Sequence, residues 1–125
     1  MNAAKRILIV DDDAFIRRPL EFMLREEGYE PSTAGDALEG LRALEAGLPD
    51  LIVLDVMMPG KDGFTFCREL KHDPRFAEIP IVLLSARGQE LDRQKGLALG
   101  AAAFVTKPYS PHEFKQCVRA LLEQR

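Results

Sequence analysis

Side chains suited to phosphate chemistry stand directly after short apolar runs at four places in the sequence. They are the pair Asp11 and Asp12, then Asp55, Ser85 and Lys107. If the apolar runs are parallel strands, their carboxyl ends meet at one edge of the sheet, where ligands bind in open α/β folds. The sequence therefore predicts a crevice that contains several carboxylates, a hydroxyl group and an ammonium group.

Three carboxylates at this edge predict a divalent cation. Asp11, Asp12 and Asp55 would raise one another's pKa by charge repulsion unless a cation lay close to them. Mg²⁺ prefers oxygen ligands and typically takes one or two carboxylates together with a phosphate oxygen and water. Asp12 and Asp55 are the candidate ligands, with Asp11 acting through water. The alternative is an ordinary turn, since Asp is common at helix N-caps and Asp13 suits that position.

A carboxylate beside a cation can also act as a nucleophile. Asp55 could attack a phosphoryl group and form an acyl phosphate. The equatorial phosphoryl oxygens would then need charged and hydrogen-bonding partners, which Lys107 and Ser85 could supply. Singly, an ordinary surface lysine and an ordinary turn serine are the better explanations of these two residues. Their joint placement at strand ends favours a site for phosphoryl transfer.

Composition predicts one cytoplasmic globular domain. The chain has 125 residues, of which 46% are hydrophobic and 30% charged, and it contains no apolar stretch long enough to span a bilayer. A net charge of -3 argues against direct binding of nucleic acid. Arg17 and Arg18 are therefore expected on a solvated helix face. Cys67 and Cys117 are expected to be buried as small hydrophobic residues.

Apolar runs alternate with helical periodicity along the chain, which predicts an α/β fold with a mostly parallel sheet. The polar run 30–34 suits a sheet edge, whereas 51–55 is apolar on both faces and should be central. The expected strands are 6–11, 30–34, 51–55, 81–85 and 103–105. The expected helices are 16–28, 37–47, 66–72, 90–99 and 114–122.

Four segments in this order, ILIVDDD, DLIVLDVMMPGKDG, IVLLSAR and FVTKPY, resemble the receiver domain of response regulators in two-component signalling. The resemblance implies a single CheY-like domain over 1–125, with its core at about 6–122. It also implies a doubly wound, flavodoxin-like sheet of five parallel strands in the order 2-1-3-4-5.

The resemblance implies roles for the acidic residues. Asp55 would accept a phosphoryl group from a histidine kinase or a histidine phosphotransfer protein. Mg²⁺ would be bound by Asp12, Asp55 and the main-chain carbonyl of Met57, with Asp11 acting through water. The domain would be no enzyme beyond slow self-phosphorylation and self-dephosphorylation.

The resemblance also implies a switch. Lys107 and Ser85 would bind the phosphoryl group, and the bond before Pro108 would be cis. As Ser85 moves toward the phosphate, Phe104 would turn inward and change the surface of the fourth helix, fifth strand and fifth helix. That surface would bind a downstream protein. The alternative for Phe104 is a static core aromatic.

The sequence departs from receivers that dimerise and carry winged-helix domains. Such receivers have an acidic pair where this chain has Ala102 and Ala103, and the segment 70–86 resembles stand-alone or enzyme-attached receivers more closely. Met57 and Arg87 occupy positions that tune self-dephosphorylation in this family. Because both side chains could hinder the attacking water, we expect a phosphorylated state that is not especially short-lived.

Two other functions are compatible with the motifs. A degenerate receiver would bind a partner without phosphorylation, although every residue needed for phosphorylation is present. A phosphatase of the haloacid dehalogenase type would use Asp11 and Asp13 as its DxD motif. The chain lacks the threonine expected after that motif and the length for a cap domain.

Overall fold

The computed structural model describes residues 3–86 and 88–123, so Arg87 lies outside the described residues. Its sheet has five strands in the order β2-β1-β3-β4-β5, and all neighbouring pairs are parallel. The strands are β1 (Arg6–Val10), β2 (Glu30–Ala34), β3 (Leu51–Asp55), β4 (Ile81–Ser85) and β5 (Ala103–Thr106). The predicted fold class and strand order are confirmed.

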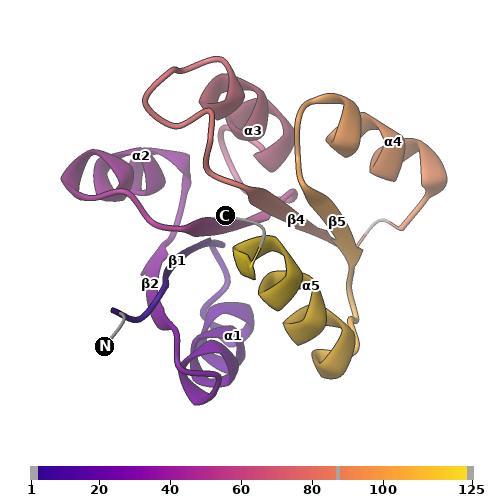
Figure 1. Ribbon diagram of the computed structural model, residues 1–125. Helices are drawn as coiled ribbons and strands as arrows, with labels where there is room; N and C mark the ends of the chain where they lie inside the picture. The colour runs from indigo at the N-terminus through magenta and orange to yellow at the C-terminus, as the bar shows by residue number, and fades with distance from the viewer. Residues whose placement is uncertain (1–2, 87, 124–125) are drawn as a thin grey trace.

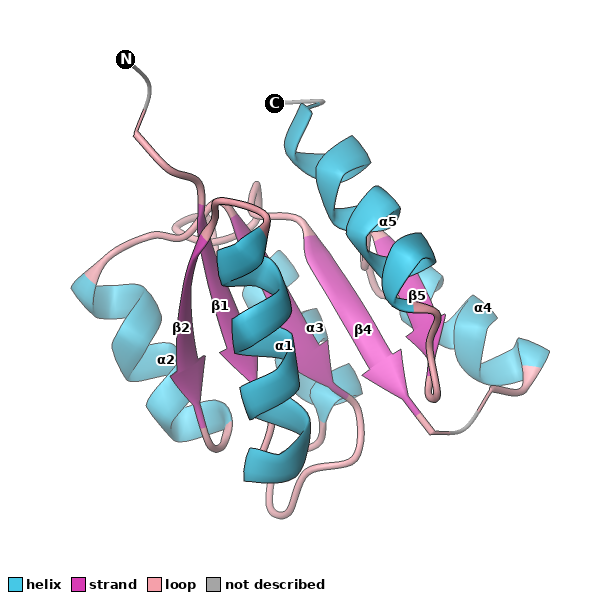
Figure 2. Cartoon of the chain, turned by 90° about the horizontal axis from the view of Figure 1, so that it is seen from below, coloured by secondary structure: helices cyan, strands magenta, loops and turns pink. Residues whose placement is uncertain are grey.

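Helices cover both faces of the sheet. α1 and α5 pack on one face, while α2, α3 and α4 lie on the other (Figure 1, Figure 2). The helices are α1 (Ala14–Glu26), α2 (Ala37–Ala46), α3 (Gly63–Lys71), α4 (Glu90–Ala98) and α5 (Pro111–Glu123). None of the helices within the described ranges has the length and apolar content needed to cross a bilayer.

Two apolar clusters, one on each face of the sheet, form the core. In β1, Ile7 and Ile9 face the cluster beneath α1 and α5, whereas Leu8 and Val10 face the cluster beneath α2 and α3. All residues of β3 and β4 are buried, because helices cover these central strands on both sides. β2 lies at the edge, as its polar sequence predicts, and exposes Glu30, Ser32 and Thr33.

Aspartate N-caps start three of the helices. The side chain of Asp13 accepts a hydrogen bond from the Phe15 N–H at 2.9 Å, which confirms its expected role at α1. Asp62 caps α3 by accepting from the Thr65 N–H, so this helix begins at Gly63 and not at the apolar residue Phe66. The Asp13 cap therefore extends α1 beyond its apolar stripe, whereas the Asp62 cap starts α3 directly before the buried Phe64.

Gly63 brings the start of α3 directly against the end of β3. A Cβ atom at this position would lie 2.3 Å from the main-chain oxygen of Asp55 and 2.8 Å from the Cα of Val56. The Gly63 N–H donates to the Val56 carbonyl at 2.9 Å. Glycine at 63 thus allows the close approach that fixes the backbone around Asp55.

The two free cysteines behave as small apolar residues. Cys67 is fully buried in the cluster beneath α2 and α3, and Cys117 packs half-buried against the cluster beneath α1 and α5. Burial raises the pKa of the Cys67 thiol to about 11. The expectation of a buried cysteine is confirmed for Cys67, whereas Cys117 is only half-buried.

Candidate functional site

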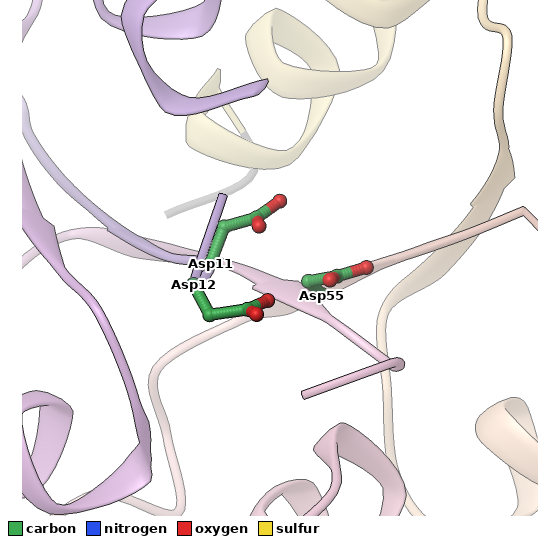
Figure 3. Close-up of side chains that lie close together, drawn as sticks. All are labelled: Asp11, Asp12 and Asp55. Atoms are coloured by element: carbon green, nitrogen blue, oxygen red, sulfur yellow. The ribbon is translucent and has the colours of Figure 1, made fainter. Parts of the chain in front are cut away.

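The three candidate carboxylates meet at the carboxyl ends of β1 and β3. Val10 pairs with Leu54 in the parallel ladder, which places the next residues, Asp11 and Asp55, at the same level. Asp12 follows directly, and Figure 3 shows the three side chains together. One oxygen of each carboxylate lies within 4.8 Å of the others. The structure therefore assembles the acidic site that the strand ends predicted.

Lys107 brings a positive charge to these carboxylates from the end of β5. Its Nζ lies 2.9 Å from Oδ1 of Asp55 and 3.6 Å from Oδ2 of Asp11. The Lys107 N–H donates to the Ser85 carbonyl at 2.7 Å, which fixes the backbone beside β4. The peptide bond from Lys107 to Pro108 is cis, as expected. The ammonium group thus joins two strand ends electrostatically.

Burial sets the electrostatics of Asp11 and Asp55. Their exposed fractions are 1% and 4%, and burial raises the pKa of both carboxyls. The charge of Asp12 raises each pKa further. The hydrogen bond from Lys107 opposes the rise at Asp55, and the Asp13 N–H opposes it at Asp11. Within the described ranges, the Lys107 ammonium group pairs with two of the three grouped carboxylates, so the site carries excess negative charge.

This arrangement fits a hard divalent cation. Oδ2 of Asp11 is buried and accepts no hydrogen bond from the described residues, while Asp12 is exposed at the mouth of the site. Carboxylate oxygens of this kind are the ligands that Mg²⁺ prefers. A cation would also reduce the repulsion that burial makes costly.

Ser85, Phe104 and Met57 lie near the site in different environments. Ser85 is fully buried at the end of β4 and pairs with Thr106. Phe104 is half-buried and packs against the core cluster on the α4 side. The Met57 side chain is 54% exposed, and its main-chain N–H lowers the pKa of Asp55 against the effect of burial. The ligand role of the Met57 carbonyl stays a prediction.

Asp13 does not join the acidic group. Its side chain caps α1, and the three grouped carboxylates belong to Asp11, Asp12 and Asp55. A DxD motif formed by Asp11 and Asp13 thus gains no support from the geometry.

The expectation of a solvated helix face is wrong for Arg17. Arg17 is half-buried, and its Nη1 donates to the main-chain oxygen of Asp11 at 2.8 Å. The reason is its place one turn after the Asp13 cap, which directs the guanidinium group back toward the turn between β1 and α1. Arg18 is exposed, as expected. The sequence signal that could have predicted this contact is the position of Arg17, four residues after the N-cap Asp13.

Comparison with curated proteins identifies a family. The family model of the response regulator receiver domain matches residues 7–119. A probable transcriptional regulator, ycf27 of Cyanophora paradoxa, is 47% identical over 120 residues, which are 96% of this chain and 49% of that protein. The phosphate regulon transcriptional regulatory protein PhoB of Escherichia coli is 41% identical over 121 residues, which are 97% of this chain and 53% of that protein. The chain spans about half the length of these relatives.

Solved structures of receiver domains have the same fold, and one of them contains a metal ion. The signal receiver domain of a histidine kinase from Syntrophus aciditrophicus has a TM-score of 0.90 and 36% identity, covering 97% of this chain and 92% of that one. The receiver domain of a sensor histidine kinase from Pseudomonas aeruginosa has a TM-score of 0.87 and 27% identity, over 97% and 99% of the two chains. That structure has a magnesium ion coordinated in its active-site cleft.

The similar proteins are of two kinds, receivers of histidine kinases and transcriptional regulators. The two solved receivers described above belong to histidine kinases. The two curated relatives, however, are transcriptional regulators and share higher identity with this chain. The class of protein suggested by the segment 70–86 therefore stays a prediction.

Proposed function

The chain belongs to the family of response regulator receiver domains, and we propose that phosphorylation of Asp55 switches it. The observation that carries this proposal is the contact of 2.9 Å between the Lys107 ammonium group and Asp55, within a group of three carboxylates. A buried nucleophilic carboxylate thus lies beside the charge that a phosphoryl group would need.

The phosphoryl donor would be a histidine kinase or a histidine phosphotransfer protein. An oxygen of Asp55 forms a bond to phosphorus while the bond from phosphorus to the donor imidazole breaks. The leaving imidazole retains the electron pair and takes up a proton. In-line transfer of this kind needs mainly positioning and charge stabilisation.

The acidic residues would hold Mg²⁺ during transfer. We assign Asp12, Asp55 and the Met57 carbonyl as ligands, with Asp11 acting through water. When bound, the ion would neutralise negative charge on the phosphoryl oxygens. Asp11 also accepts the Asp13 N–H at 2.9 Å and so keeps the turn after β1 in place.

Lys107 and Ser85 would bind the phosphoryl group after transfer. The Lys107 ammonium group, which pairs with Asp55 in this structure, would pair with a phosphoryl oxygen. The Ser85 hydroxyl would donate to another oxygen, and Phe104 would turn inward in response. Pro108, the residue that follows Lys107 in the chain, would have a structural role. The output would be a changed surface on α4, β5 and α5.

That surface would bind a downstream protein, and the receiver itself would contact neither nucleic acid nor membrane. α4 supports this role, since Leu91 and Leu97 are exposed while only Asp92 and Gly96 of the helix are buried. A helix with few buried side chains moves at low energetic cost. We propose that the receiver is cytoplasmic. It would form one domain over 1–125, with its core at about 6–122. Its only activities would be slow self-phosphorylation and self-dephosphorylation.

Labelling by a small phosphodonor tests the proposal. Wild type incubated with acetyl phosphate and Mg²⁺ should gain one phosphoryl group by intact mass, and Asp55→Asn should gain none. Asp36→Asn is the matched control, because Asn caps a helix as well as Asp and residue 36 lies at the start of α2. Equal labelling of Asp55→Asn and wild type would refute the assignment. A wild type that is never labelled would instead indicate a phosphorylation-independent binding module.

A further inference from the structure

Asp12 differs from the other two carboxylates in how it is held. Asp11 accepts a hydrogen bond from the Asp13 N–H, and Asp55 accepts one from Lys107. The exposed Asp12 side chain has no hydrogen bond or ion pair with any residue in the ranges that the structure describes. Its direction therefore depends on the conformation of its own backbone.

Side-chain hydrogen bonds hold both peptide groups that flank Asp12. The carbonyl of the preceding peptide, at Asp11, accepts from Nη1 of Arg17 at 2.8 Å. The N–H of the following peptide, at Asp13, donates to Oδ1 of Asp11 at 2.9 Å. The two peptide planes fix the two soft backbone dihedrals between them. They consequently fix the direction of the Cα–Cβ bond of Asp12, from which its carboxylate extends.

Arg17 is anchored well enough to serve this purpose. Its own N–H donates to the Asp13 carbonyl at 3.0 Å, in the first turn of α1. Its guanidinium group lies beside Gly35, where a Cβ atom would come 3.3 Å from Nη1 of Arg17 and 3.1 Å from Oε2 of Glu39. The absence of a side chain at 35 thus leaves the space that the guanidinium group uses.

We propose that Arg17 is a positioning residue for the metal ligand Asp12, an inference that rests on the proposed function. The guanidinium group would keep the peptide between Asp11 and Asp12 in the orientation that presents the Asp12 carboxylate to Mg²⁺. Interactions that orient metal ligands in this way are typically worth about 10- to 100-fold in metal affinity.

Charge and positioning make opposite predictions for the loss of Arg17. Removal of a positive charge near a cation site should strengthen Mg²⁺ binding through Coulomb's law. Loss of positioning should weaken it. Arg18 provides a matched control, because it is the adjacent arginine of α1 and makes no hydrogen bond or ion pair with the part of the chain that the structure describes.

Isothermal titration calorimetry with Mg²⁺ alone tests the proposal on the full chain. Arg17→Met should raise the Mg²⁺ dissociation constant about 10- to 100-fold. Arg18→Met should leave it unchanged or slightly lower. An unchanged or lower dissociation constant in Arg17→Met would overturn the proposal. If the wild type itself binds no Mg²⁺, the proposed function fails first and the role of Arg17 fails with it.

Two further variants separate positioning from general damage to the fold. In an Asp12→Ala background, Arg17→Met should cause no additional loss of Mg²⁺ affinity, since the residue through which Arg17 acts is gone. An equal loss in both backgrounds would overturn the proposal. Gly35→Val retains Arg17 but crowds its guanidinium group, so it should weaken Mg²⁺ binding even if Arg17→Met does not fold. Wild-type affinity in Gly35→Val would likewise contradict the assignment.

Discussion

Asp55 is a carboxylate whose burial opposes its own ionisation. Burial holds its pKa in the folded protein above the ordinary value of 3.8, although the hydrogen bond from Lys107 lowers it in part. Between these two values the folded state binds more protons than the unfolded state. Stability contributed by this group therefore falls as pH rises through that window. The same sign holds for Asp11.

Asp55→Asn should therefore stabilise the metal-free protein increasingly as pH rises above the ordinary carboxyl pKa of 3.8, because the Asn oxygen can still accept from Lys107. The measurement is urea unfolding in EDTA at a series of pH values, with the free energy of unfolding of the variant compared with wild type. Asp73→Asn is the control. Hydrogen bonds from Arg75 lower the pKa of Asp73, so the effect of this substitution on the free energy of unfolding should depend on pH with the opposite sign. A difference between Asp55→Asn and wild type that is independent of pH would contradict the assigned burial.

Cys67 should be unreactive toward thiol reagents in the folded protein. A pKa of about 11 leaves roughly one thiolate in a thousand at pH 8, and the side chain is fully buried. In Cys117→Ser, a disulfide reagent should therefore label Cys67 only after denaturant is added. Cys67→Ser should show faster labelling of half-buried Cys117. Rapid labelling of Cys67 without denaturant would show that the core around α3 opens readily.

The sequence predicted the acidic residues and Lys107 because each stands at a strand end, where strand direction alone brings them together. Arg17 was not predicted as part of the site. Its contact depends on how a long side chain folds back over a helix cap, and a local pattern of polar and apolar residues does not encode that direction. The role of Gly35, which leaves space for the Arg17 guanidinium group, is visible only when the position of that group is known.

At the scale of elements, the central strands were predictable and the helix starts were less so. β3 and β4 are apolar on both faces, which determines that they lie under helices on both sides. α1 and α3 begin before Ile16 and Phe66, where apolar spacing predicted their starts, because Asp13 and Asp62 cap these helices at Ala14 and Gly63. A rule that follows apolar spacing begins a helix too late in such cases.

Gly63 joins two elements, and its substitution should affect both stability and phosphorylation. A Cβ atom at this position would meet main-chain atoms of Asp55 and Val56, so Gly63→Ala should cost about 1–3 kcal/mol and displace Asp55. The measurements are the free energy of unfolding and the rate of labelling by acetyl phosphate.

Gly47→Ala is the matched control for this substitution. The atoms nearest to its added Cβ atom would be the flexible end of the Arg6 side chain, at the start of β1 and so at the opposite end of the sheet from Asp55. The control should therefore keep the wild-type labelling rate. Labelling of Gly63→Ala at the wild-type rate would show that the approach of α3 to β3 does not position Asp55.

At the scale of the whole molecule, the strand order places the residues of the site on strands in different parts of the sheet. The acidic residues follow β1 and β3, whereas Lys107 follows the edge strand β5 and reaches Asp55 past the end of β4. Any change in the partner of Lys107 therefore acts directly on β5 and on the helices that adjoin it. α2 lies on the same face of the sheet as α4 but near the opposite edge, beside β2 (Figure 1).

Phosphorylation should consequently change hydrogen exchange in α4, β5 and α5 and leave α2 unchanged. α2 provides the internal control, and Lys107→Ala tests the connection, since this variant lacks the ammonium group that would join the phosphoryl group to β5. At a level of phosphorylation matched by intact mass, Lys107→Ala should show little exchange change in α4 and β5. The same exchange pattern in Lys107→Ala and wild type would mean that the signal leaves the site by another route, with Ser85 as the next residue to test.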